Sequence, residues 1–224
     1  CEPCLKGKNT RDSRPPSKTV VPHPCHILHA DVLTLNELDV NGHKYCLCVV
    51  DGKTAKCVVH LLKDKSDVKL VFPDIVAMFE RQGGHPVLRV RTDRGGEFMN
   101  AELQQYFRAM GILYEHTAGH SSESNGVAER MNRTLMDKAR TMVKAASAPT
   151  NWWGYALIMA NQLHNWIPVS TKHTRSSPDE AFHGVTPNLS YLQPFGAVAY
   201  VHVPTALRKK LDDHVVKGTL IGFA

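Results

Sequence analysis

Three acidic residues occupy positions where a carboxylate is unfavourable unless it has a chemical task. Asp31 interrupts an apolar, strand-like run, Asp93 ends another such run, and Glu129 follows Asp93 after thirty-five intervening residues. A carboxylate in an apolar strand costs free energy unless it is paired or binds a metal ion. Two carboxylates on strands and one on a helix can converge on a pair of divalent metal ions. Because all of these ligands are oxygens, the pattern favours Mg2+ or Mn2+.

A long helix that begins at Val127 is expected to carry Glu129 in its first turn. Its apolar positions recur at helical spacing and would face the core: Val127, Met131, Leu135 and Met142. Beside them runs a row that contains Glu129 and three cations: Arg133, Arg140 and Lys144. The ordinary interpretation is an acidic residue that the helix dipole favours, with Arg133 as its i,i+4 partner. Taken alone, the helix supports that interpretation, and only the two upstream Asp residues favour a metal site.

Strands and helices alternate in the chain before this helix. Strands are expected at 26–33, 44–51, 56–62, 87–92 and 112–116, and helices at 66–81 and 100–110. Asp51-Gly52 begins a turn between the second and third strands, which predicts a hairpin. In the second helix, Leu103, Phe107 and Met110 are expected to face inward. This order of elements predicts an α/β fold with a mixed sheet flanked by helices.

The spacing of the three carboxylates resembles the D,D-35-E signature of retroelement integrases. The flanking segments Arg91-Thr92-Asp93-Arg94-Gly95-Gly96-Glu97-Phe98 and 125–133 look like copia-type LTR-retrotransposon integrases in particular, and the similarity covers nearly the whole chain. The resemblance implies a ribonuclease H-like fold and a catalytic core that is part of a Gag-Pol polyprotein. It also implies that Asp31 bridges two Mg2+ (or Mn2+) ions, of which Asp93 shares one and Glu129 the other.

An integrase of this kind joins the ends of element cDNA to target DNA by metal-dependent strand transfer, with the phosphodiester chemistry of an endonuclease. The residues expected to contact DNA are Asn125, Arg130, Arg133, Arg140 and Lys144. Met136 departs from retroviral integrases, which often carry Lys at that position. Two alternatives stay open. One is an inactive or domesticated relic that binds nucleic acid without catalysis, and the other is a ribonuclease H-like nuclease that cuts without transferring strands.

Three domains are expected along the chain. Residues 1–24 look like the end of a zinc-binding module followed by a basic, Pro-rich linker. A tetrahedral zinc site needs four ligands, so Cys1 and Cys4 are expected to bind Zn2+ only with the upstream His pair that the family carries. Residues 25–186 would form the catalytic core, and 187–224 the truncated beginning of a small C-terminal β-barrel. The helix that begins near Asn151 is nearly apolar all round, as in a core helix or a self-association face.

The composition agrees with a nucleic-acid partner. A net charge of +6 and an isoelectric point near 9.0 suit a polyanion such as DNA. No apolar run approaches the ~20 residues that cross a bilayer, and no signal peptide is visible, so no membrane partner is expected. Four of the six Cys lie in apolar, strand-like contexts, as free thiols of a reducing, intracellular compartment do. The resemblance implies a homo-oligomer that is nuclear during integration and lies in a cytoplasmic particle before it.

Overall fold

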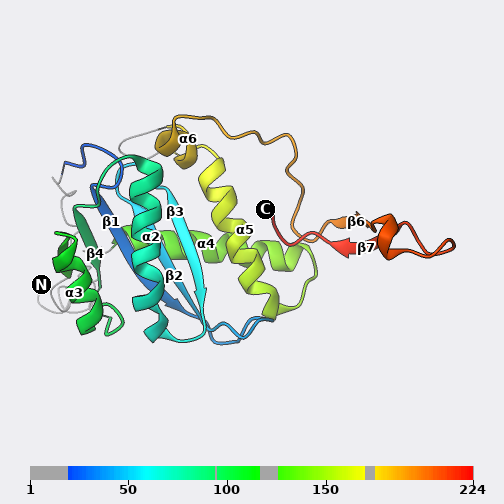
Figure 1. The fold of residues 1–224 in the computed structure, drawn as a ribbon, viewed down its shortest axis with the longest axis horizontal. Coiled ribbons are helices and arrows are strands. Elements are labelled where there is room, and N and C mark those ends of the chain that lie inside the picture. The colour runs from blue at the N-terminus through cyan, green and yellow to red at the C-terminus, as the bar shows by residue number, and fades with distance from the viewer. Residues whose placement is uncertain (1–19, 94, 117–125, 170–174, 224) are drawn as a thin grey trace, which may run out of the picture.

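The computed structural model describes residues 20–93, 95–116, 126–169 and 175–223 of the chain. Its main sheet has five strands in the order β3-β2-β1-β4-β5 (Figure 1). The bounds are β1 Ile27–Thr34, β2 Tyr45–Asp51, β3 Cys57–Leu62, β4 Arg89–Thr92 and β5 Leu113–His116. β1, β2 and β3 pair in antiparallel fashion, whereas β4 and β5 run parallel to β1. The predicted mixed sheet and the predicted hairpin are confirmed.

Helices cover both faces of this sheet. They are α2 Val68–Gly83, α3 Ala101–Ala109, α4 Gly126–Ala145, α5 Trp153–Trp166 and α6 Pro178–His183, with 3-10 turns at Lys65–Asp67, Thr150–Trp152 and Thr205–Leu207. Figure 1 shows α2 crossing in front of the sheet while α4 passes behind it. Because side chains alternate along a strand, each strand contributes to two cores. Toward α2 and α3 point Leu28, Ala30, Leu47 and Val49; toward α4 and α5 point Cys46, Cys48, Val50 and Cys57.

The helix ends follow local signals in the sequence. α2 continues through Pro73 and ends at Gly84, whose left-handed φ of 68° only glycine adopts freely. Asn100 caps α3 by accepting a hydrogen bond from the backbone N–H of Leu103. The expectation for Met110 is wrong, since its side chain is 51% exposed. The helix ends one residue earlier and Gly111 reverses the chain with a φ of 67°, so the helical spacing no longer applies.

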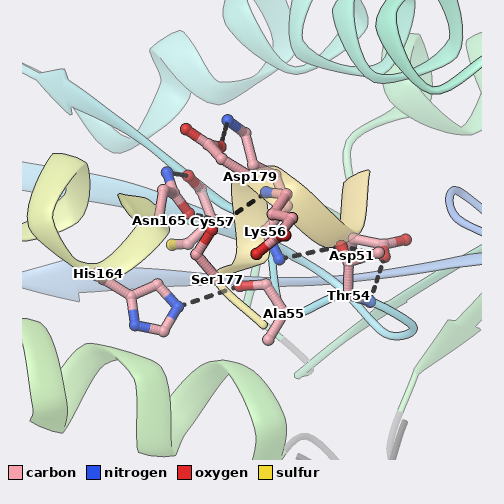
Figure 2. Close-up of polar contacts among 10 residues, drawn as sticks. Asp51, Thr54, Ala55, Lys56, Cys57, His164, Asn165, Ser177 and Asp179 are labelled. Atoms are coloured by element: carbon pink, nitrogen blue, oxygen red, sulfur yellow. Dashed lines mark hydrogen bonds and ion pairs between the residues drawn. The ribbon is translucent and has the colours of Figure 1, made fainter. Parts of the chain in front are cut away.

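A polar network attaches α5 and α6 to the edge strand β3 (Figure 2). The Asn165 side chain accepts a hydrogen bond from the backbone N–H of Cys57 at 2.9 Å and donates one to its carbonyl at 2.7 Å. One residue earlier, His164 Nε2 lies 3.0 Å from the carbonyl oxygen of Ala55. Lys56 forms an ion pair with Asp179 of α6. The side chains at the end of α5 therefore take the place of a further strand beside this part of β3.

Burial confirms the core interpretation of α5. Its buried residues include Trp153, Leu157 and Met159, and the end of the chain covers part of the rest. The Gln162 amide donates to the carbonyl of Phe223 at 2.7 Å, and the Phe223 ring lies 5.9 Å from the ring of Trp166. The apolar surface of α5 is thus largely used within this chain.

The C-terminal segment forms a second, two-stranded antiparallel sheet of β6 Val198–His202 and β7 Val215–Thr219, which extends away from the main sheet (Figure 1). The domain boundaries expected from the sequence stay predictions. The four described cysteines, Cys25, Cys46, Cys48 and Cys57, are free and buried, as expected. None of the helices in the described ranges combines the length and apolarity needed to cross a membrane.

Candidate active site

The register of the parallel strands places Asp31 beside Asp93. β1 and β4 pair Leu28 with Val90 and His29 with Arg91. The same register continued by two positions brings Asp31 to the level of Asp93, and burial followed by the charge of Asp93 raises the pKa of Asp31. Asp93 follows the last residue of β4 directly. Because Leu28 and Ala30 point toward α2, Asp31 points to the other face, where α4 lies. The two carboxylates therefore share one end and one face of the sheet.

Glu129 reaches the same place from α4. It lies in the first turn of that helix and lines a cavity of about 330 Å3 whose walls come from β1 and α4. The lining residues are Asp31, Val32, Leu33, Thr34, Glu129, Asn132, Arg133 and Met136. The structure thus brings Asp31 and Glu129 to one cavity, and Asp93 is close enough to Asp31 to raise its pKa beyond the effect of burial.

The surroundings of Asp31 disfavour its charged form. Burial, followed by the negative charge of Asp93, raises the pKa of Asp31 to about 6, and Glu129 adds to the rise. Two hydrogen bonds to the carboxylate act in the opposite direction, one from the backbone N–H of Val32 at 3.0 Å and one from the Asn132 amide at 2.8 Å. Across the hairpin, Asp31 faces the buried, uncharged thiol side chain of Cys48. Without a cation, this site therefore holds more negative charge than its neighbours compensate.

A compact turn fixes Asp93. Its carboxylate accepts a hydrogen bond from the backbone N–H of Gly95 at 2.9 Å, and its carbonyl accepts one from the Thr92 hydroxyl at 2.7 Å. Thr92 is in turn 2.9 Å from the hydroxyl of Tyr114 on β5. A Cβ atom at Gly95 would lie 2.6 Å from the carboxyl carbon of Glu97, so a larger residue there would displace the end of the Glu97 side chain.

Asn132 is a site residue that the sequence analysis missed. It is 7% exposed and holds the Asp31 oxygen that Val32 does not. The signal was available, because Asn132 follows Glu129 by three residues and positions i and i+3 share one side of a helix. It escaped notice because its type is not that of an acid, a base or a first-choice metal ligand.

The cations expected to bind DNA separate in the structure. Arg133 lines the cavity with Glu129, whereas Arg130 extends over the start of α4, where a Cβ at Gly126 would meet its guanidinium at 2.9 Å. Arg140 donates to the Asp137 carboxylate at 2.8 Å. At 1.5 Å per residue, Arg140 and Lys144 lie about 17 and 22 Å along the helix from Glu129. Asn125 and the proposed zinc ligands Cys1 and Cys4 lie outside the described residues.

The donor set fits hard divalent cations, but not one ion held by three side chains. Within the described ranges, no three His, Cys, Asp or Glu residues are gathered closely enough to hold one metal ion. A two-ion site needs pairs of carboxylates instead, with phosphate oxygens and water completing each shell. Asp31 can form one such pair with Asp93, which follows the neighbouring strand β4, and another with Glu129, which lines the same cavity. The pKa of Asp31 is raised by burial and then by the charge of Asp93, and a bound cation would oppose both effects.

The chain is similar in sequence to known proteins. Residues 21–122 match the family model of the integrase core domain. Over all 224 residues the chain is 35% identical to the retrovirus-related Pol polyprotein from transposon TNT 1-94 of Nicotiana tabacum, and 28% identical to that from transposon RE1 of Arabidopsis thaliana. The chain spans 17% and 15% of these two relatives.

Solved structures show the same fold at 18% identity. A simian T-cell lymphotropic virus intasome, solved in complex with PP2A regulatory subunit B56 gamma, matches with a TM-score of 0.64 over 98% of this chain and 76% of that one. The HTLV-2 integrase catalytic core domain, in a trimeric form in complex with magnesium, matches with a TM-score of 0.55 over 72% of this chain and 99% of that one. The ribonuclease H-like expectation is confirmed. Residues 21–122 are thus similar to integrase core domains, and the whole chain is similar in sequence to the Pol polyproteins of two plant transposons.

Proposed function

We propose that this chain is the catalytic segment of a retrotransposon integrase that joins the ends of element cDNA to target DNA. One observation carries the proposal: Asp31 on β1 and Asp93 directly after the parallel strand β4 are close enough for the Asp93 charge to raise the pKa of Asp31 beyond the effect of burial, and Glu129 lines a cavity together with Asp31. A cluster of carboxylates at the end of a sheet suits phosphodiester chemistry better than a structural role, because no Lys or Arg of the described residues forms an ion pair with Asp31, Asp93 or Glu129.

The reaction moves a phosphodiester bond without a covalent enzyme intermediate. The 3′-oxygen of one cDNA end attacks a target phosphorus in line, and the bond from that phosphorus to the target 3′-oxygen breaks. The attacking hydroxyl loses its proton, and the leaving 3′-oxygen gains one. Mg2+ or Mn2+, when bound, would favour the deprotonated attacker and stabilise the negative charge on the leaving oxygen. The magnesium complex of the HTLV-2 core supports this choice of metal.

Each site residue has a distinct task in this proposal. Asp31 would be shared by both metal ions, with Asp93 completing one pair and Glu129 the other. Asn132 keeps one Asp31 oxygen in place by donating to it. Arg133, on the wall of the same cavity, would position a DNA phosphate without reading the base sequence.

The test is joining of a labelled duplex end to a plasmid with Mg2+ or Mn2+, using the chain together with the polyprotein sequence that adjoins it in its element. Asp93→Asn and Glu129→Gln are each expected to lower the joining rate about a thousandfold or more, or about 4 kcal/mol of transition-state stabilisation. Asp137→Asn is the matched control, since Asp137 is exposed on the same helix. Unchanged joining by Asp93→Asn would refute the assignment.

Asn132→Ala is expected to weaken metal binding and joining by about 10- to 100-fold, as is usual when a residue that orients a metal ligand is lost. Titration of the joining rate with Mn2+ measures this effect. Excess metal should restore most of the rate in Asn132→Ala and none in Asp93→Asn. Equal rates for Asn132→Ala and the parent chain at limiting metal would show that the amide does not orient Asp31.

The alternative is a relic that binds nucleic acid without catalysis. It would join no DNA with any metal, yet would keep salt-sensitive DNA binding through the exposed cations of α4. The trimeric form of the HTLV-2 core and the viral intasome support an oligomer for the active state. Integration into chromosomal DNA would require entry into the nucleus.

A further inference from the structure

A second cavity, of about 340 Å3, lies at the same end of the sheet as the carboxylates but on the opposite face. Its lining residues are Lys65, Ser66, Lys69, Gly96, Glu97 and Asn100. Lys65 and Ser66 follow the end of β3, and Gly96 and Glu97 follow the end of β4. β3 and β4 point in the same direction, and β2 and β1 lie between them in the sheet. The cavity therefore lies at the edge of the sheet where β1 ends and β2 begins, and Lys69 of α2 contributes to its wall.

The carboxylate site lies at the same edge but on the α4 face of the sheet. Asp31 lies near the end of β1 and points to the α4 face, while the second cavity lies on the α2 face. A nucleic-acid strand that crosses the edge would place one phosphate at the carboxylates and another near Lys65 and Lys69. The two cavities thus lie on the two sides of one path.

The lysines remain available to an external anion. Lys65 Nζ lies 3.7 Å from Glu97, but the Glu97 side chain is only 8% exposed and is turned against Gly95, whereas that of Lys65 is 43% exposed. Lys69 pairs with Glu102 at 2.9 Å, and the Glu102 side chain is 66% exposed. An ion pair open to water contributes little free energy, so a phosphate can replace Glu102. In the two ion pairs, the Lys65 side chain is more exposed than its partner Glu97, and the partner of Lys69 is held only by a pair open to water.

The cavity also leaves room for a sugar-phosphate backbone. A Cβ atom added at Gly96 would have no heavy atom within 4 Å. The Asn100 side chain is used within the protein, since it caps α3 and donates to the Glu97 carbonyl at 2.7 Å. The Nζ atom of Lys65 lies 5.8 Å from the centre of the ring of Tyr45, the first residue of β2. Two lysines beside a glycine that leaves space in the cavity suit a phosphate group and not the edge of a base.

We propose that Lys65 and Lys69 bind the phosphate backbone of the DNA duplex that crosses the carboxylate edge on its α2 side. This inference rests on the proposed function only for the path of the DNA; the contact itself can be measured without joining. It assigns a nucleic-acid surface to a face of the sheet that the α4 cations do not reach.

The test measures binding of a fluorescent duplex of mixed sequence, sealed by hairpins at both ends, in EDTA and over a range of salt concentrations. Replacing both lysines (Lys65→Gln with Lys69→Gln) is expected to weaken binding and to lower the slope of log Kd against log salt by about 2, or about 1 per lost phosphate contact. Arg81→Gln is the matched control, because Arg81 is exposed in the last turn of α2, at the far end of that helix. Thermal melting checks that each variant folds.

A second variant separates charge from access. Gly96→Phe fills the cavity without changing the charge, so it is expected to weaken duplex binding while the two lysines stay in place. An unchanged salt slope in the double lysine variant, or equal losses in that variant and Arg81→Gln, would overturn the proposal. Joining by the parent chain tests the proposed function separately. A chain that joins DNA but shows no lysine effect refutes only the second surface, and a chain that shows the lysine effect but joins nothing refutes only the catalytic proposal.

Discussion

Asp31→Asn is expected to abolish joining and, at the same time, to stabilise the metal-free chain by up to about 3 kcal/mol. The folded-state pKa of Asp31 is about 6, against an ordinary value of 3.8. Below pH 3.8 the carboxyl is protonated in both states, so no penalty exists. Between pH 3.8 and 6 the folded state binds more protons, and the free energy of unfolding falls as pH rises. Above pH 6 the penalty is complete, at about 1.4 kcal/mol for each unit of pKa difference.

Urea unfolding in EDTA at pH 4, 6 and 8 measures this effect. From pH 4 to pH 6 the free energy of unfolding of the parent chain is expected to fall relative to that of Asp31→Asn. Above pH 6 the difference between the two is expected to stay constant. Mg2+ should restore stability to the parent chain and not to the variant, since a ligand stabilises only the state that binds it. A variant less stable than the parent chain at pH 8 would contradict the explanation.

Asp51→Asn provides the opposite case on the neighbouring strand. The Asp51 carboxylate accepts hydrogen bonds from the backbone N–H groups of Cys25, Lys53 and Thr54 and from the Thr54 hydroxyl. An amide NH2 in that position would face N–H donors, so the substitution is expected to destabilise the fold. The two substitutions together distinguish a carboxylate kept for chemistry from one kept for structure.

Asn165→Ala is expected to lower the free energy of unfolding by about 2–5 kcal/mol. The side chain satisfies both backbone groups of Cys57, and each buried group left without a partner costs about 1–3 kcal/mol. Cys57 is fully buried, so water cannot easily replace the amide. Chemical denaturation at pH 7 measures the change.

Asn161→Ala, one helical turn earlier, is the matched control. Its Oδ1 atom is buried and has no hydrogen-bond partner among the described residues, so its loss should change stability by less than about 1 kcal/mol. Equal effects of the two substitutions would mean that the contact of Asn165 with β3 is not what stabilises this edge. The loss of stability in Asn165→Asp should lie between the losses in Asn161→Ala and Asn165→Ala, because this substitution keeps the hydrogen-bond acceptor but removes the donor.

The sequence predicted the elements that local patterns determine. The hairpin of β2 and β3, the long helix α4 and the placement of Asp31 within one strand and of Asp93 at the end of another all follow from alternation, turn residues and helical spacing. The prediction that Met110 faces inward failed because helical spacing applies only within the helix. The helix ends at Ala109, and Gly111 then reverses the chain.

What the sequence could not show depends on contacts between distant segments. Lys65 and Gly96 lie far apart in the chain. They line one cavity only because β3 and β4 end at the same edge of the sheet. Likewise, the bond between Asn132 and Asp31 joins residues 101 positions apart. Arg140 and Lys144 share a row with Glu129, but periodicity alone does not say how far along the helix the site extends.

The parallel pairing of β1 with β4 limits how such chains can change length. The connections between strands lie outside the ladder, so insertions there leave the opposition of Asp31 and Asp93 intact. One residue inserted within β1 before Asp31 would turn every later side chain to the other face. The carboxylate would then enter the core beside Leu47 and Phe72, and Val32 or Ala30 would face α4. The connections between the strands can therefore change in length, while the number of residues within β1 and β4 before the two carboxylates is fixed by the alternation of side chains.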